Sequence, residues 1–95
     1  MSAEKFSMSL GLNQNVAYGG EVYHVQTEDG GRRNPVVTTL LFKGGVIIAS
    51  RRTDYSDIVK SDKLEVVIRD IIRQQHTSVV SDLMRGELTA EKKEK

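Results

Sequence analysis

The chain has 95 residues, of which 38% are hydrophobic and 28% charged, and its formal net charge is +1. This length predicts a single domain over residues 1–95 with one modest core. The small net charge argues against nucleic-acid binding as a function, since strong binders usually carry a larger basic excess. Because the chain has no cysteine, disulfides, thiolate metal sites and cysteine nucleophiles are excluded. No stretch is apolar enough for a signal peptide or a membrane span, so we expect a cytoplasmic protein.

Two strands are predicted at the N-terminal end of the chain. Residues 5–18 alternate between apolar and small or polar side chains, which is typical of a strand with one buried face. The Gly-Gly pair that follows predicts a two-residue hairpin turn, and residues 21–29 form the returning strand. In this register Val16 pairs with Tyr23. The opposite face then carries a row of polar side chains.

A second hairpin is predicted after a loop that contains the single proline of the chain. Residues 36–43 are β-branched and apolar on both faces, which indicates a central strand. A second Gly-Gly pair leads to a strand over residues 46–53. This register places Phe42 opposite Ile47 and Thr38 opposite Arg51.

The remaining residues predict two helices and a charged tail. Thr53 or Asp54 is a candidate cap for a short helix over about 54–60. Ser61 or Asp62 is a candidate cap for a long helix over about 62–86, with Glu65 completing a capping box, and Gly86 is a candidate C-cap. Residues 87–95 are expected to be frayed. The apolar stripe of the long helix consists of Leu64, Val67, Ile68, Ile71, Ile72, Val79 and Leu83, with Gln75 and His76 on it or beside it.

The fold predicted from these elements is α+β: a four-stranded antiparallel sheet, built from two Gly-Gly hairpins, with a long C-terminal helix packed on one face. One helix covers one face of such a sheet, yet strand 36–43 is apolar on both. We therefore expect a partner chain, or the overhanging residues 5–9 of the first strand, to cover the second face.

The polar row of the first hairpin is the first candidate site. It comprises Asn13, Asn15, His24, Gln26 and Glu28. A solvated sheet face explains such a row, because alternation demands one. A surface that binds a polar ligand or a peptide explains it as well. Catalysis by His24 and Glu28 has weaker support, because side chains on one strand point in parallel. With two histidines in the whole chain, no metal site is expected.

Four arginines form the second candidate site. Arg32 and Arg33 lead into the third strand, and Arg51 and Arg52 end the fourth, so all four are expected at one end of the sheet. Such a cluster could hold a phosphate or an acidic segment of a partner. The alternative is a solvated rim paired with nearby carboxylates.

Three segments carry a resemblance to known sequences: "NVAYGGEVYHVQTEDGG", "NPVVTTLLFKGGVIIASRRTDY" and "IIRQQH". They resemble a family of short uncharacterised bacterial proteins, mainly from delta-class proteobacteria, over about residues 12–86. The resemblance places His24, Gln26, Thr27, Glu28 and Asp29 within the pattern of the family. It implies no activity and assigns no catalytic residue.

The function expected from the sequence is a small non-enzymatic adaptor that binds another protein and forms a homodimer, without cofactors. The candidate association surfaces are the N-terminal strand, with Phe6 and Met8, and a second stripe of the long helix, with Val66, Val80 and Met84. The alternative is a sensor that binds a small ligand or a nucleotide through the polar row or the arginines. An enzyme has the weakest support.

Overall fold

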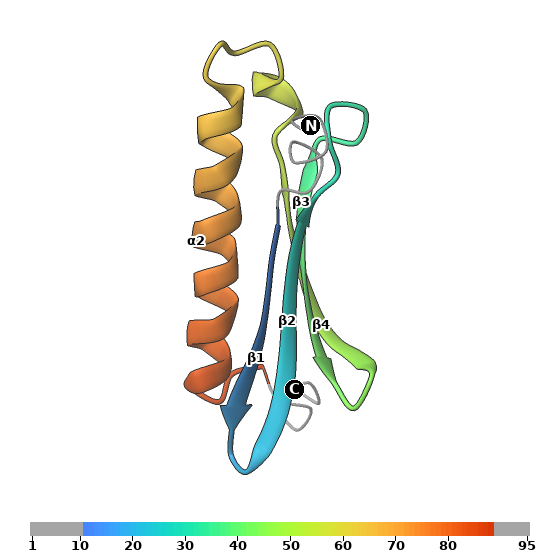
Figure 1. The fold of residues 1–95 in the computed structure, drawn as a ribbon, viewed down its shortest axis with the longest axis vertical. Coiled ribbons are helices and arrows are strands. Elements are labelled where there is room, and N and C mark those ends of the chain that lie inside the picture. Colours follow the sequence, from blue (N-terminus) through green and yellow to red (C-terminus); the bar gives the residue numbers. More distant parts are fainter. Residues whose placement is uncertain (1–10, 89–95) are drawn as a thin grey trace, which may run out of the picture.

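The computed structural model describes residues 11–88, which form an antiparallel sheet and a long helix. The sheet order follows the chain order, and its strands are β1 (Gly11–Tyr18), β2 (Glu21–Asp29), β3 (Val36–Lys43) and β4 (Val46–Asp54). A short 3₁₀ helix, η1 (Ser56–Ile58), leads to α2 (Leu64–Met84), which lies along one face of the sheet (Figure 1). The predicted α+β architecture is confirmed.

Glycine pairs form both hairpin turns. Gly19 and Gly20 have φ values of 61° and 82°, and Gly44 and Gly45 have 61° and 81°. These left-handed conformations match the right-handed twist of the strands that a two-residue turn must join. The register of the first hairpin, with Val16 opposite Tyr23, is as predicted.

The second hairpin contains a β-bulge that the sequence did not reveal. Phe42 lies opposite Ile47 as predicted, but the next pair is Leu41 with Ala49, so Ile48 is an extra residue on β4. Because of this insertion, Thr38 lies opposite Arg52, and the prediction that it faces Arg51 is wrong. A bulge reverses the face to which the following side chains point. It therefore turns Arg51 toward α2.

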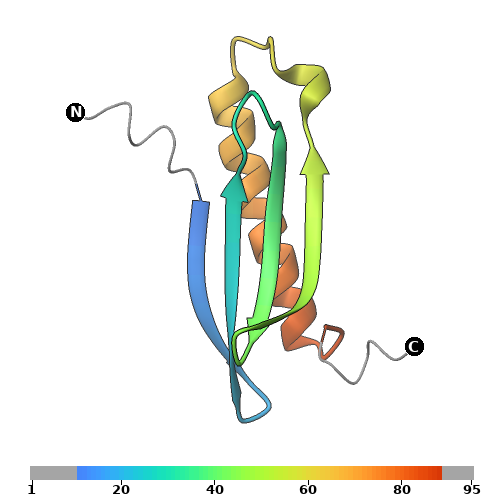
Figure 2. The same ribbon diagram turned by 90° about the vertical axis from the view of Figure 1, so that its right-hand side faces the viewer.

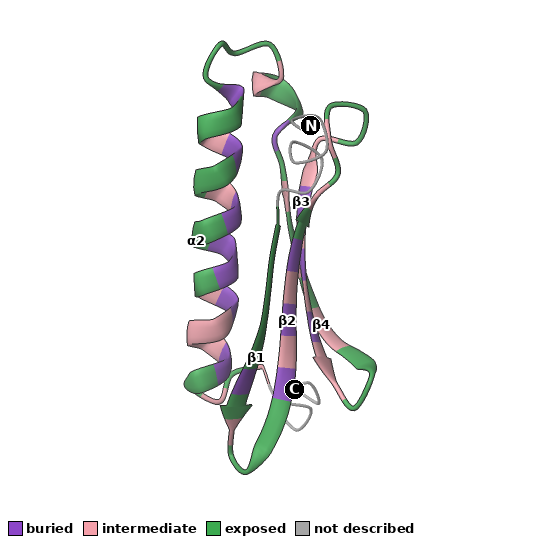
Figure 3. Cartoon of the chain, in the orientation of Figure 1, coloured by how far each residue is buried: buried purple, intermediate pink, exposed green. Residues whose placement is uncertain are grey.

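The core lies between α2 and the sheet, and the buried stripe of the helix faces the strands (Figure 3). One apolar cluster comprises Val16, Tyr23, Val25, Leu41, Val79 and Leu83. A second cluster comprises Val37, Tyr55, Leu64, Ile68 and Ile72. The predicted stripe is mostly buried, although Val67 and Ile71 are only half-buried. Gln75 and His76 are buried between the two clusters.

The prediction is wrong for the first turn of α2 and confirmed for its C-terminus. No side chain caps the first turn, and the Ser61 hydroxyl instead accepts a hydrogen bond from the Lys63 N–H at 3.0 Å, so the predicted capping box is wrong. At the other end, Gly86 has a φ of 77° and its N–H donates to the Leu83 carbonyl at 2.8 Å. The predicted role of Gly86 at the helix C-terminus is confirmed, since this geometry is that of a Schellman motif.

The predicted short helix is reduced to the single turn of η1. Strand β4 continues to Asp54, which pairs with Val36, so the helix cannot begin as early as predicted. The Asp54 carboxylate accepts a hydrogen bond from the Ser56 N–H at 2.8 Å. Hydrogen bonding to the Ser56 side chain, and then to this N–H, holds the pKa of Asp54 below its usual value. Asp54 therefore stabilises the turn between β4 and η1.

The second face of the sheet is bare over the described residues. Figure 2 shows the four strands in front of α2, with no other described element over them. The overhang predicted for residues 5–9, including Phe6 and Met8, lies outside the described residues. Within residues 11–88, no helix is long and apolar enough to cross a membrane.

Candidate functional site

The bare sheet surface opposite α2, here called the open face, is organised as three cross-strand rows. Each row runs from β1 to β4 through directly paired residues. The histidine row is Asn15, His24, Phe42 and Ile47; the central row is Asn13, Gln26, Leu40 and Ser50; the charged row is Gly11, Glu28, Thr38 and Arg52. All five residues of the predicted polar row therefore lie on this face.

His24 is held in place by its neighbours. Its Nδ1 lies 3.0 Å from Oδ1 of Asn15, and its Nε2 lies 3.2 Å from Oδ1 of Asn13. Its ring centroid is 5.8 Å from that of Phe42, at an interplanar angle of 49°. Both ring nitrogens are thus engaged, and the imidazole bridges the β1 amides while packing against β3.

The rest of the polar row is also paired within the chain. The Gln26 amide donates to the Glu28 carboxylate at 3.3 Å. Glu28 belongs to the charged row and His24 to the histidine row, with the central row between them. The geometry does not bring the two groups together as a general acid and base would require.

Apolar side chains occupy the other half of the open face. Leu40 and Phe42 are half-buried on β3, in the middle of the sheet. Val22 and Ile47 are 63% and 52% exposed. Large apolar side chains gathered on one bare surface are typical of an interaction site rather than of a solvated face.

The four predicted arginines do not form a cluster. Arg51 and Arg52 point to opposite faces of the sheet, because neighbouring strand residues alternate. Arg32 donates a long hydrogen bond, 3.4 Å, to the Val59 carbonyl, and Arg33 is exposed in the loop before β3. The geometry therefore gives no support to a phosphate or acidic-segment site formed by all four arginines, and the solvated rim remains the simpler interpretation.

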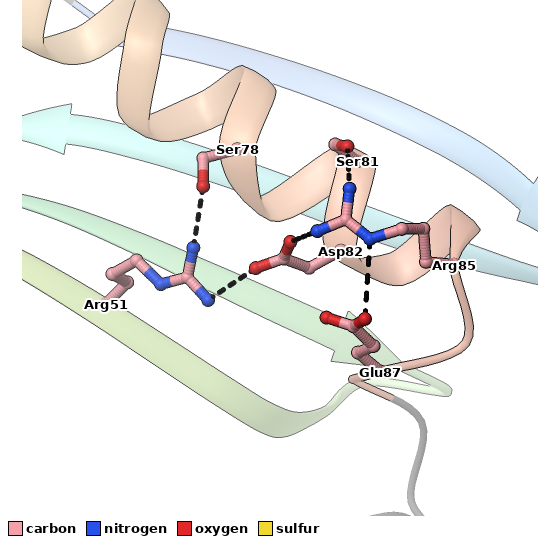
Figure 4. Close-up of polar contacts among 6 residues, drawn as sticks. All are labelled: Arg51, Ser78, Ser81, Asp82, Arg85 and Glu87. Atoms are coloured by element: carbon pink, nitrogen blue, oxygen red, sulfur yellow. Dashed lines mark hydrogen bonds and ion pairs between the residues drawn. The ribbon is translucent and has the colours of Figure 1, made fainter.

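Arg51 instead joins β4 to α2, as Figure 4 shows. Its guanidinium donates to the Ser78 hydroxyl at 2.9 Å and to the Asp82 carboxylate at 2.9 Å. The other oxygen of Asp82 accepts from Arg85, which also pairs with Glu87 at 3.4 Å. Charge-assisted contacts of this kind stabilise the helix position.

A nearby groove of about 290 Å³ is lined by Arg51, Thr53, Ile71, Gln74, Gln75 and Ser78.

A layer of buried polar side chains separates the two apolar clusters. The Gln75 amide donates to the hydroxyl of Thr39 at 3.0 Å, and the Thr39 hydroxyl lies 2.7 Å from that of Thr27. The Thr27 hydroxyl lies 2.8 Å from Nδ1 of His76, whose Nε2 lies 2.9 Å from the Gln14 amide oxygen. If the His76 imidazole is neutral, donates from Nε2 and accepts at Nδ1, every hydrogen bond in this series has one donor and one acceptor.

Two groups in the core have shifted pKa values. Burial lowers the pKa of His76 from its ordinary value, because the charged form loses hydration. Burial raises the pKa of Tyr55, and the hydrogen bond that its hydroxyl donates to the Asp29 carboxylate at 2.5 Å raises it further. Both side chains are therefore uncharged in the folded chain at pH 7.

Sequence reasoning missed the buried polar layer. The sequence predicts Gln75 and His76 on the helix stripe or beside it, and it predicts His24 on the face away from His76, which the structure confirms. The available signal was Thr27, a polar residue on a strand face that also carries Tyr23 and Val25. It could have indicated a polar partner on the helix.

The outer face of α2 is less apolar than predicted. Val66 and Met84 are exposed, but Val80 is half-buried and packs against the first core cluster. Helical spacing places Arg69 and Arg73 between the two exposed positions. The second stripe is therefore interrupted by charge.

No described group of three or more histidine, aspartate or glutamate side chains in residues 11–88 could hold a metal ion. No family model, curated protein or solved structure matches the chain.

Proposed function

We propose that the chain is a non-enzymatic protein–protein interaction module that docks its partner on the open face of the sheet. The observation that carries this proposal is the contrast between the two faces. On one face, α2 covers the strands. On the other face, no described element covers the apolar side chains of Leu40, Phe42, Val22 and Ile47.

The polar half of the open face supports the same function. His24 is hydrogen-bonded to both Asn13 and Asn15, which orders these side chains before a partner arrives. Pre-ordered side chains lose little conformational entropy on docking. A polar border beside apolar anchors is the usual composition of a protein interface.

The alternative, a sensor of small ligands or nucleotides, has less support. The groove beside β4 is lined by one guanidinium, that of Arg51. That group is already bound to Ser78 and Asp82, so an anion would have to displace an ion pair.

Photo-crosslinking in the host cell tests the proposed function. Replacing Phe42 with the photoreactive residue p-benzoylphenylalanine keeps an aromatic ring on the open face, in the histidine row of β3. We expect covalent adducts with protein from this position and none from the same replacement at Val66, on the outer face of α2. If position 42 yields no protein adduct, or no more than position 66, the open face is not a docking surface.

A further inference from the structure

We infer that the occupant of the open face is a second copy of this chain, related by a two-fold axis that crosses the strands above the central row. This inference rests on the proposed function and names its partner. The area of the face, the position of Leu40 and the arrangement of the charges support it.

The area of the open face suits a dimer. With strands about 4.8 Å apart and a rise of about 3.4 Å per residue, four strands of eight or nine residues present about 500 Å². Two such faces bury about 1,000 Å² in total, without the added surface of the side chains that project from them. This area is about the minimum expected of a specific protein interface. A symmetric dimer uses the same patch on both copies, so one bare face per chain is sufficient.

The central row defines the axis. Leu40 lies in the middle of the three rows and on a central strand. A two-fold axis perpendicular to the strands at this row places Leu40 over the partner's Leu40, at a sheet separation of about 10 Å. An axis parallel to the strands, between β2 and β3, would instead place Leu40 over the partner's Gln26 and bury an amide against an aliphatic side chain.

The charges of the face are compatible with the same axis. The charged row carries Glu28 and Arg52, whereas the histidine row carries no carboxylate and no guanidinium. The axis exchanges these two rows, so Glu28 meets the partner's His24 and Arg52 meets the partner's Ile47. No like charges face each other, and the aliphatic stem of an arginine can cover an apolar side chain while its head reaches water.

Substitution at the axis tests the inference in the full chain. By native mass spectrometry and light scattering we expect twice the chain mass for the wild type. Leu40→Asp should weaken association about 100-fold, because it buries two carboxylates against each other. Val66→Asp, an equal change on the outer face of α2, should leave the dimer intact. Far-UV circular dichroism checks that both variants are folded.

A second measurement keeps the wild-type surface nearly unchanged. Because the chain contains no cysteine, Ser50→Cys introduces a single thiol on the central row. The axis places the backbones of the two residues at position 50 about 10 Å apart, with their side chains facing each other, so a short bismaleimide should link two chains. Val66→Cys should give no such product. A dimer in which Ser50→Cys fails to cross-link would overturn the axis.

The outcomes separate the inference from the function on which it rests. A wild-type chain that is monomeric at millimolar concentration, or a dimer unaffected by Leu40→Asp, overturns the second copy as occupant. If adducts at position 42 then contain a different protein, the docking function stands without the dimer. If no protein adduct forms at position 42, the function itself fails.

Discussion

The buried amide of Gln75 allows a sharp test of the core, because Gln74 beside it is exposed on the same helix. The Gln75 amide nitrogen lies 3.0 Å from the Val37 carbonyl, 3.0 Å from the Thr39 hydroxyl and 3.1 Å from the Arg51 carbonyl, so its two N–H groups are shared among three acceptors. It also accepts a hydrogen bond from Thr53. One side chain therefore links α2 to two strands of the sheet.

The cost of removing this amide follows from these contacts. Each buried hydrogen bond contributes about 0.5–1.5 kcal/mol net, and groups left unpaired add to the loss. We expect Gln75→Ala to lower the free energy of unfolding by about 3 kcal/mol, from a total of about 5–15 kcal/mol typical of small domains. Gln74→Ala should change it by less than about 0.5 kcal/mol, although the change in residue type and helix propensity is the same.

Urea unfolding followed by circular dichroism measures both values at one fixed protein concentration, since dimerisation makes apparent stability concentration-dependent. The reasoning is refuted if the two variants differ by less than about 1 kcal/mol. That result would mean that water replaces the Gln75 amide, and that the polar layer does not hold the helix to the sheet.

Two further predictions concern His76 and Arg51. Because burial lowers the pKa of His76 in the folded chain below the ordinary value of 6.5, its contribution to stability is complete above pH 6.5. Below pH 6.5 that contribution should fall by at most about 1.4 kcal/mol per pH unit; thermal denaturation at pH 8 and pH 5 should show this loss, and His76→Gln should reduce it. Arg51→Ala should cost about 1–2 kcal/mol because the contacts to Ser78 and Asp82 are lost, whereas Arg69→Ala should cost less than about 0.5 kcal/mol. Equal losses for the two arginines in urea titrations would contradict the register set by the bulge.

Much of the fold could be predicted because its signals are local. Two Gly-Gly pairs between alternating runs determine both hairpins, since two-residue turns need residues that tolerate positive φ. The alternation also assigns His24 to the face opposite Tyr23, and the structure confirms it. The apolar pattern of residues 36–43, together with a single long helix, also predicts a second face that the helix does not cover, and within residues 11–88 no element covers it.

The bulge at Ile48 could not be predicted, because nothing in "VIIASRRT" distinguishes a bulged from a regular strand. Strand pairing beyond a turn depends on how the sheet twists and packs, and one inserted residue reverses the faces that follow. Arg51 and Arg52 point to opposite faces, and the four arginines do not converge. Arg51 turned toward α2, where Asp82 could meet it.

By itself, the sequence determined the strands, their turns, the buried stripe of the helix and the polar row of the open face, because these depend on contacts between residues near in the chain. The tertiary structure decided which polar groups meet. Thr27 and His76 are 49 residues apart, and their hydrogen bond depends on where α2 lies along the sheet. That position is set by the packing of the whole core, which no local pattern encodes.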